Sequence, residues 1–223
     1  MPTRIKICGV NDPTVASVAA EAGADAIGLV FVAGSPRCVS IEQASAILNG
    51  LPAFVEPVAL FVDAPTERIR STAASLGINA VQLHGHEAPD DVRALQPLRV
   101  IKAVGFRAGP DAASCCAPWR GISNVAGLLF ESAERNGSLS GGSGHRFDWA
   151  ALAECLQGVA LDAAPPVIIA GGLTPGNVAE AIRTIRPYAV DVSSGVESQR
   201  GVKDSQLIRA FCAAVRDADR HAT

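Results

Sequence analysis

Two short apolar runs, residues 167–170 and 189–192, each end in small residues of the kind that bind phosphate. Glycine lets backbone N–H groups approach an anion closely, and serine hydroxyls add hydrogen-bond donors without bulk. Either turn alone is equally compatible with a tight connection from a strand to a helix. Because the two turns lie one repeat apart, the pattern predicts that they bind one phosphate group together. The predicted phosphate ligands are Gly171, Gly172, Ser194 and Gly195.

Four further side chains that could do chemistry stand at the ends of other apolar runs, namely Cys8, Arg37, His84 and Glu131. The cysteine could project a thiol, the arginine could grip a carboxylate with its planar fork, and the glutamate could act as a general acid. The first three also have ordinary interpretations, as a core cysteine, a surface arginine and a hydrogen-bonded histidine. A single histidine with no acid or cysteine at ligand spacing predicts no metal site.

Strand-length apolar runs alternate with helix-length amphipathic runs along the chain. We expect strands near 4–8, 25–31, 55–62, 79–83, 98–104, 126–131, 166–170 and 189–193. We expect helices near 12–22, 40–49, 66–75, 88–95, 110–117, 148–156, 175–185 and 204–217. The helix over 175–185 is predicted to follow a Thr174 cap, with Pro175 at its first position. Eight β-α repeats without a GxGxxG motif after the first strand favour an α/β fold, a single (β/α)8 or TIM barrel over residues 1–223.

Such a barrel builds its active site at the carboxyl ends of its strands, so the candidate residues should meet at one mouth. The longest irregular stretch, Ser132 to Gly144, is rich in glycine and serine. We expect a mobile loop there, which fits a lid over the mouth or an ordinary flexible insertion equally well.

The composition argues against several classes of protein. With 223 residues, 48% of them hydrophobic, the chain can bury a large core. Only 18% of residues are charged and the net charge is −3, which gives no reason to expect nucleic acid or an anionic membrane as partner. No apolar run approaches the roughly 18 residues of a membrane span. The six cysteines lack CxxC or Cys/His metal spacing and predict reduced thiols in a cytoplasmic protein.

Several motifs together resemble the phosphoribosylanthranilate isomerases of tryptophan biosynthesis, and the similarity covers nearly the whole chain. The motifs are KICG at 6–9, GADA at 23–26, SPR at 35–37, QLHG at 82–85, GGSG at 141–144, FDW at 147–149, AGGL at 170–173, DVSSGVE at 191–197 and GVKD at 201–204. The resemblance implies an Amadori rearrangement of N-(5-phosphoribosyl)anthranilate that needs no cofactor. The expected partner is this small phosphorylated substrate, and the chain is expected to act as a monomer or a homodimer.

The resemblance also implies roles for the candidate residues. Cys8 would be the general base, Glu131 the general acid, and Arg37 the residue that holds the anthranilate carboxylate. The glycine and serine turns would bind the phosphate, and His84 is placed with the substrate-binding residues. The family has aspartate where this chain has Glu131, and the extra methylene shifts the carboxyl group by roughly 1 Å, a displacement that can reduce a rate on the order of a hundredfold.

Two other functions fit parts of the pattern. A barrel that binds a phosphorylated sugar-amine without efficient catalysis would explain Glu131, but it would need neither Cys8 nor Arg37. The related sugar isomerase of the histidine pathway acts on a substrate with two phosphates. The end of the third strand, at 61–65, offers no second glycine-rich turn to bind the other phosphate.

Overall fold

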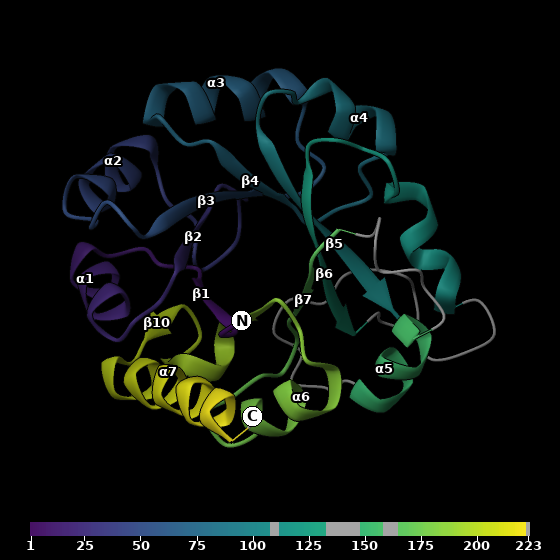
Figure 1. Ribbon diagram of the computed structural model, residues 1–223. Helices are drawn as coiled ribbons and strands as arrows, with labels where there is room; N and C mark the ends of the chain where they lie inside the picture. The colour runs from purple at the N-terminus through teal and green to yellow at the C-terminus, as the bar shows by residue number, and fades with distance from the viewer. Residues whose placement is uncertain (108–111, 133–147, 158–164, 222–223) are drawn as a thin grey trace.

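The computed structural model describes residues 1–107, 112–132, 148–157 and 165–221. Eight parallel strands pair in sequence order and close into a barrel where β8 meets β1 (Figure 1). The strands are β1 (Arg4–Cys8), β2 (Ala26–Val30), β3 (Glu56–Phe61), β4 (Ala80–Leu83), β5 (Arg99–Phe106), β6 (Val125–Ser132), β7 (Val167–Ile169) and β8 (Ala189–Val192). This closed barrel confirms the predicted (β/α)8 fold.

The helices surround the barrel, as Figure 1 shows. They are α1 (Pro13–Glu21), α2 (Ile41–Asn49), α3 (Thr66–Leu76), α4 (Pro89–Ala94), α5 (Trp149–Gln157), α6 (Val178–Ile185) and α7 (Ser205–Arg220). Asp12, Ser40 and Asp204 cap α1, α2 and α7 by accepting hydrogen bonds from first-turn N–H groups. Each cap fixes the residue at which a connection from the mouth of the barrel enters its helix.

The start predicted for the helix over 175–185 was wrong. α6 begins at Val178, and residues 174–177 form a turn instead. Asn177 stabilises this turn, because its Oδ1 accepts from the Thr174 N–H at 2.8 Å and its Nδ2 donates to the Gly172 carbonyl at 2.9 Å. Thr174 therefore belongs to the connection that follows β7 and does not cap a helix.

Two further elements differ from expectation. The segment predicted as a helix near 110–117 contains the 3-10 helix η1 (Ala112–Trp119) in its described part. After β8 the chain forms a short 3-10 helix, η3 (Ser194–Val196), and then an unpredicted antiparallel hairpin, β9 (Glu197–Gln199) and β10 (Val202–Lys203). The loop expected over 132–144 lies, apart from Ser132, outside the described residues.

The barrel interior contains charged side chains. Side chains alternate along a strand, so in β1 Ile5 and Ile7 face the helices while Lys6 and Cys8 face inward. In β8 the same alternation places Asp191 inside the barrel between two outward-facing valines. Lys6 and Asp191 are 4% and 6% exposed, so the floor of the mouth is polar and buried.

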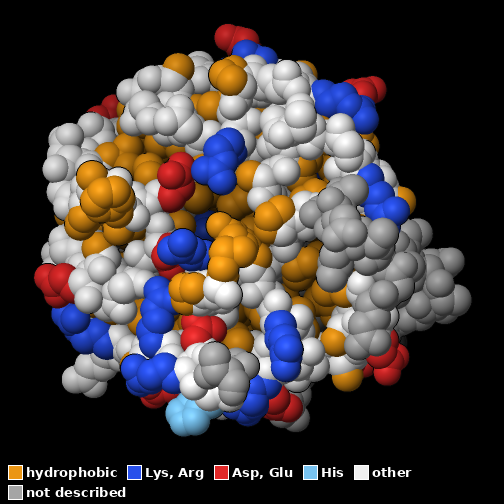
Figure 2. All heavy atoms as spheres, viewed as in Figure 1, with side chains coloured by type: hydrophobic (Ala, Val, Ile, Leu, Met, Phe, Trp, Pro, Cys, Tyr) orange, Lys and Arg blue, Asp and Glu red, His pale blue; other side chains and the backbone are white. Residues whose placement is uncertain are grey.

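The outer surface carries charges of both signs. On the face seen in Figure 2, Lys and Arg side chains lie among Asp and Glu side chains and do not gather into one basic patch. Within the described residues, no helix combines the length and the apolar character that crossing a membrane requires.

Candidate active site

A cavity of about 310 Å³ opens at the carboxyl ends of the strands. All eight candidate residues predicted from the sequence line it, so the fold brings together residues from β1 and β6 and from the connections after β2, β4, β7 and β8. The lining residues are Cys8, Val30, Val32, Ser35, Arg37, Leu60, Val62, Gln82, His84, Gly85, His86, Glu131, Ala170, Gly171, Gly172, Leu173, Asp191, Val192, Ser193, Ser194 and Gly195.

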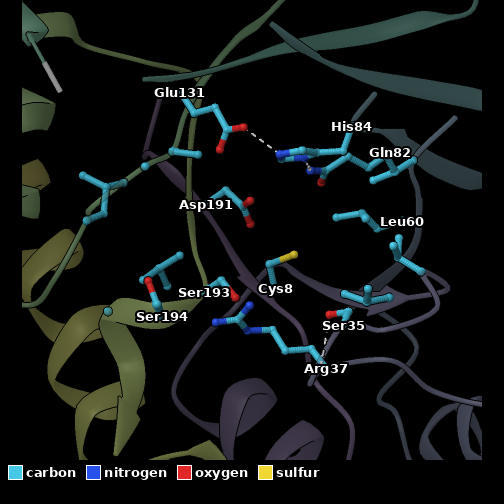
Figure 3. A pocket seen from close by; sticks show the side chains of 18 of the residues that line it. Cys8, Ser35, Arg37, Leu60, Gln82, His84, Glu131, Asp191, Ser193 and Ser194 are labelled. Carbon is cyan, nitrogen blue, oxygen red and sulfur yellow. Dashed lines mark hydrogen bonds and ion pairs between the residues drawn. The ribbon is translucent and has the colours of Figure 1, made fainter. Parts of the chain in front are cut away.

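Cys8 is the last residue of β1 and is 5% exposed. Its thiol points into the cavity in Figure 3. Gly28 on the neighbouring strand leaves room for it, since a Cβ there would lie 2.9 Å from the sulfur. Burial raises the pKa of the Cys8 thiol, and the positive charge of Lys6 opposes that rise only in part. The thiol form therefore predominates at neutral pH.

The Lys6 ammonium lies two residues before Cys8 and forms a buried ion pair with Asp191, with 2.9 Å between Nζ and Oδ1. Burial lowers the pKa of Lys6, but the combined effect of Asp191 and the Cys8 sulfur outweighs burial. The pKa of Lys6 is therefore raised above its ordinary value. A fixed cation thus lies beside the thiol. Lys6 and Asp191 were not among the predicted site residues, although each is a charged residue within a strand-like apolar run.

Glu131, near the end of β6, is 3% exposed and contacts His84. The distance from His84 Nε2 to Glu131 Oε1 is 2.7 Å (Figure 3), and Gln82 Nε2 lies 2.9 Å from His84 Nδ1. Because the Gln82 amide N–H donates to Nδ1, the imidazole proton belongs on Nε2, where it points at the carboxylate. His84 therefore holds the Glu131 carboxylate in place while its own ring lines the cavity.

Arg37 reaches the cavity from the connection after β2, with 13% of its side chain exposed. Its Nε and Nη2 donate to the two carboxylate oxygens of Glu197 at 2.6 and 2.8 Å, and this pairing raises the pKa of the guanidinium. Two donors of the fork are thus engaged by the protein. Within the described part of the chain Nη1 has no hydrogen-bond partner, so it is the group that a ligand carboxylate would meet.

The two small-residue turns lie against each other. Gly171 and Gly172 have φ of +77° and +66°, which other residues rarely adopt. A Cβ at Gly195 would lie 1.8 Å from the Leu173 carbonyl oxygen, so the turn after β8 packs directly on the connection after β7. No hydrogen bond among the described residues uses the N–H of Gly171 or Gly172. These donors remain available to an anion.

The donor set does not suit a metal ion. Among the described residues, no group of three His, Cys, Asp or Glu side chains is arranged to hold one. The buried carboxylates of the mouth are each paired instead: Asp191 with Lys6, and Glu131 with His84.

Comparisons with known proteins agree on one family. The family model for N-(5'-phosphoribosyl)anthranilate (PRA) isomerase matches residues 5–214. The isomerase of Pseudomonas fluorescens (strain SBW25) is 44% identical over 215 residues, which are 96% of each chain. The crystal structure of the Thermotoga maritima enzyme has a TM-score of 0.83 at 35% identity, covering 96% of this chain and 99% of that one. A phosphoribosylanthranilate isomerase in complex with reduced 1-(o-carboxyphenylamino)-1-deoxyribulose 5-phosphate has a TM-score of 0.82 at 35% identity, with the same coverage.

Proposed function

The chain belongs to the N-(5'-phosphoribosyl)anthranilate isomerase family, and we propose that Cys8 and Glu131 carry out its reaction as general base and general acid. The enzyme converts N-(5'-phosphoribosyl)anthranilate to 1-(2-carboxyphenylamino)-1-deoxyribulose 5-phosphate in tryptophan biosynthesis. The observation that supports our assignment is that a thiol and a carboxyl group from strands β1 and β6 line one cavity together with Arg37 and the two small-residue turns.

The reaction requires an acid and a base in sequence. Glu131 protonates the oxygen of the ribose ring while the anthranilate nitrogen lone pair opens the ring to a Schiff base. Cys8 then removes the proton from C2′ to give an enolamine. The enolamine becomes the ketose by gaining a proton at C1′ from the Cys8 thiol and losing its 2′-hydroxyl proton to the Glu131 carboxylate, which restores both groups. The hydrogen lost at one carbon is gained at the next, so the chemistry needs no external oxidant or reductant.

The cycle needs Cys8 as a thiolate, because the thiolate and not the neutral thiol is the effective base. Burial raises the pKa of Cys8 and so favours the neutral thiol. The positive charge of Lys6 opposes that rise in part, because it stabilises the thiolate.

The ends of the substrate are held by different connections. We assign the phosphate to the turns at Gly171-Gly172 and Ser194-Gly195, which line the cavity and offer backbone N–H groups and a hydroxyl as donors. We assign the anthranilate carboxylate to Arg37. His84 acts through Glu131 in this scheme, which modifies its predicted role as a direct substrate ligand. The solved relative that binds the reduced product analogue holds a molecule with both of these acidic ends.

The test is turnover of freshly prepared phosphoribosylanthranilate, followed by the loss of anthranilate-type fluorescence. Cys8→Ser should keep the fold and substrate affinity but lose most turnover, because an alcohol is a far poorer base than a thiol. Unchanged turnover in the serine variant would contradict the role of Cys8.

We further propose that residues 1–223 form one barrel domain and that the protein acts in the cytoplasm as a monomer or a homodimer. Its six free cysteines suit a reducing compartment. One similar solved isomerase, from Thermotoga maritima, is dimeric in its original form. Light scattering on the purified protein distinguishes the two oligomeric states.

A further inference from the structure

The β9–β10 hairpin packs against the connection that carries Arg37. At its tip, Gly201 has φ of +86°, and a Cβ there would lie 2.8 Å from the Pro36 carbonyl oxygen. Asn11, in the connection after β1, donates to the Gly201 carbonyl at 3.3 Å. The hairpin thus lies directly beside the residue before Arg37, although more than 160 residues separate them in sequence.

Glu197, the first residue of the hairpin, has four hydrogen bonds to its carboxylate and a side chain only 4% exposed. Oε1 accepts from Arg37 Nε at 2.6 Å and from Lys203 Nζ at 2.8 Å. Oε2 accepts from Arg37 Nη2 at 2.8 Å and from the Gly201 N–H at 3.0 Å. Burial alone would raise the pKa of Glu197, but the bonds from Arg37 and Lys203 lower it to about 2. The carboxylate therefore stays ionised between two cations.

Lys203, the last residue of the hairpin, connects this carboxylate to the turn after β8. Its side chain is fully buried. Besides Glu197, its ammonium donates to the Ser193 carbonyl at 2.9 Å and to the Ser193 hydroxyl at 3.2 Å. All three N–H bonds of the ammonium are used, so Lys203 fixes the residue immediately before Ser194 and Gly195.

The stem of Arg37 is held on its other side by Gly9. A Cβ at Gly9, where φ is +76°, would lie 2.4 Å from Arg37 Cδ. The arginine stem therefore crosses the chain directly after Cys8. With Gly9 against the stem and Glu197 against the head, Arg37 is held on two sides, and Nη1 is not engaged by Glu197.

We propose that Glu197 and Lys203 are positioning residues that fix Arg37 and the turn after β8 at a set separation, and so match the mouth to a substrate with a carboxylate at one end and a phosphate at the other. This inference rests on the proposed function, in which Arg37 binds the anthranilate carboxylate. The hairpin contributes no group to the chemistry. It aligns the two anion-binding ends across the reacting sugar.

The experiment compares the affinities of three ligands: the reduced product analogue with its carboxylate, the same compound with an unsubstituted phenyl ring, and inorganic phosphate. Glu197→Gln places an amide NH2 against the donors of Arg37 and Lys203, so at least one contact is lost. The variant should reduce the preference for the carboxylate compound by about tenfold and change the affinity for the phenyl compound little. Lys203→Met should in addition weaken the binding of inorganic phosphate, because it removes the two hydrogen bonds that hold Ser193.

Glu21→Gln is the matched control, since Glu21 pairs with Arg209 on the exposed surface and should alter none of the three affinities. Glu197→Asp keeps the buried charge if the glutamine variant fails to fold, and its shorter reach should also lower the carboxylate preference. The proposal is overturned if the Glu197 variants weaken both ring compounds equally or neither. Arg37→Ala separates the two claims: if it leaves the carboxylate preference intact, the assigned role of Arg37 is wrong, whereas if it alone abolishes that preference, only the role of the hairpin is wrong.

Discussion

The side chain of Glu131 is long enough to place its carboxylate against the His84 ring. Its Oε1 lies 2.7 Å from His84 Nε2, and His84 is itself oriented by Gln82. The family resemblance gives aspartate at this position, which would withdraw the carboxyl group toward β6. The imidazole contact therefore explains how a longer side chain can be held in a defined place, because a buried carboxyl group with a charge-assisted hydrogen bond loses little orientation to thermal motion.

Glu131→Asp should lower kcat by tenfold to about a hundredfold, because the carboxyl group retreats by roughly 1 Å from both His84 and the reacting oxygen. Glu131→Gln should abolish turnover, since an amide supplies no proton, while substrate still binds. Glu87→Asp is the control: Glu87 is a buried glutamate paired with Lys102 at 3.0 Å but does not line the cavity. It should leave kcat unchanged. An aspartate variant at position 131 as fast as the parent would show that the strand end already suits the shorter acid.

At the level of elements, the connections after β7 and β8 form one unit. Asn177 ties the first connection together through Thr174 and Gly172, and Gly195 lets the second approach the Leu173 carbonyl. This packing explains why α6 starts three residues later than its sequence pattern suggests. The hydrogen bonds of Asn177 hold residues 174–177 in a turn against Gly172, so these residues do not form the first turn of the helix.

Gly195→Ala should therefore weaken phosphate binding. Its Cβ would meet the Leu173 oxygen at 1.8 Å, so the two turns must separate, and the KM for the substrate and the dissociation constant of inorganic phosphate should both rise about tenfold or more. Gly176→Ala provides the comparison, because its nearest neighbour, the Thr174 hydroxyl oxygen, is 3.8 Å away. If both alanine variants bind phosphate like the parent, the close packing of the turns is not needed for the site.

Across the whole molecule, barrel closure assembles the site from residues that are distant in sequence. Cys8 and Asp191 become neighbours because β1 pairs with β8, with Lys6 opposite Asp191 in the register. Arg37 and Glu197 meet because the chain continues beyond β8 into a hairpin that returns over the connection after β2. The site thus depends on the first and last parts of the barrel being joined.

Because the site depends on barrel closure, only part of it could be predicted from the sequence. Strand ends with glycine, cysteine or a carboxylate follow local patterns, so eight of the lining residues were recognisable from the chain alone. Lys6 and Asp191 are charged residues within apolar runs, but their pairing depends on barrel closure and could not be predicted. Glu197 and Lys203 lie within motifs of the family resemblance, which do not show that they contact Arg37 and the turn after β8. Their burial becomes evident only when the hairpin is placed against Arg37.

A ligand that bridges both anion-binding ends should stabilise the whole barrel. At a concentration one hundred times its dissociation constant, the reduced product analogue adds about 2.7 kcal/mol to the free energy of unfolding. For a chain of this size that corresponds to a rise in Tm of about 5 to 11 °C, measurable by differential scanning fluorimetry. Cys8→Ser should keep this shift at the same ligand concentration, because the thiol contacts the reacting carbon and neither end. Gly195→Ala should show a smaller shift at that concentration, since its affinity is lower. A parent protein with no shift at saturation, or a serine variant that loses the shift, would mean that the ligand does not bridge the ends as assigned.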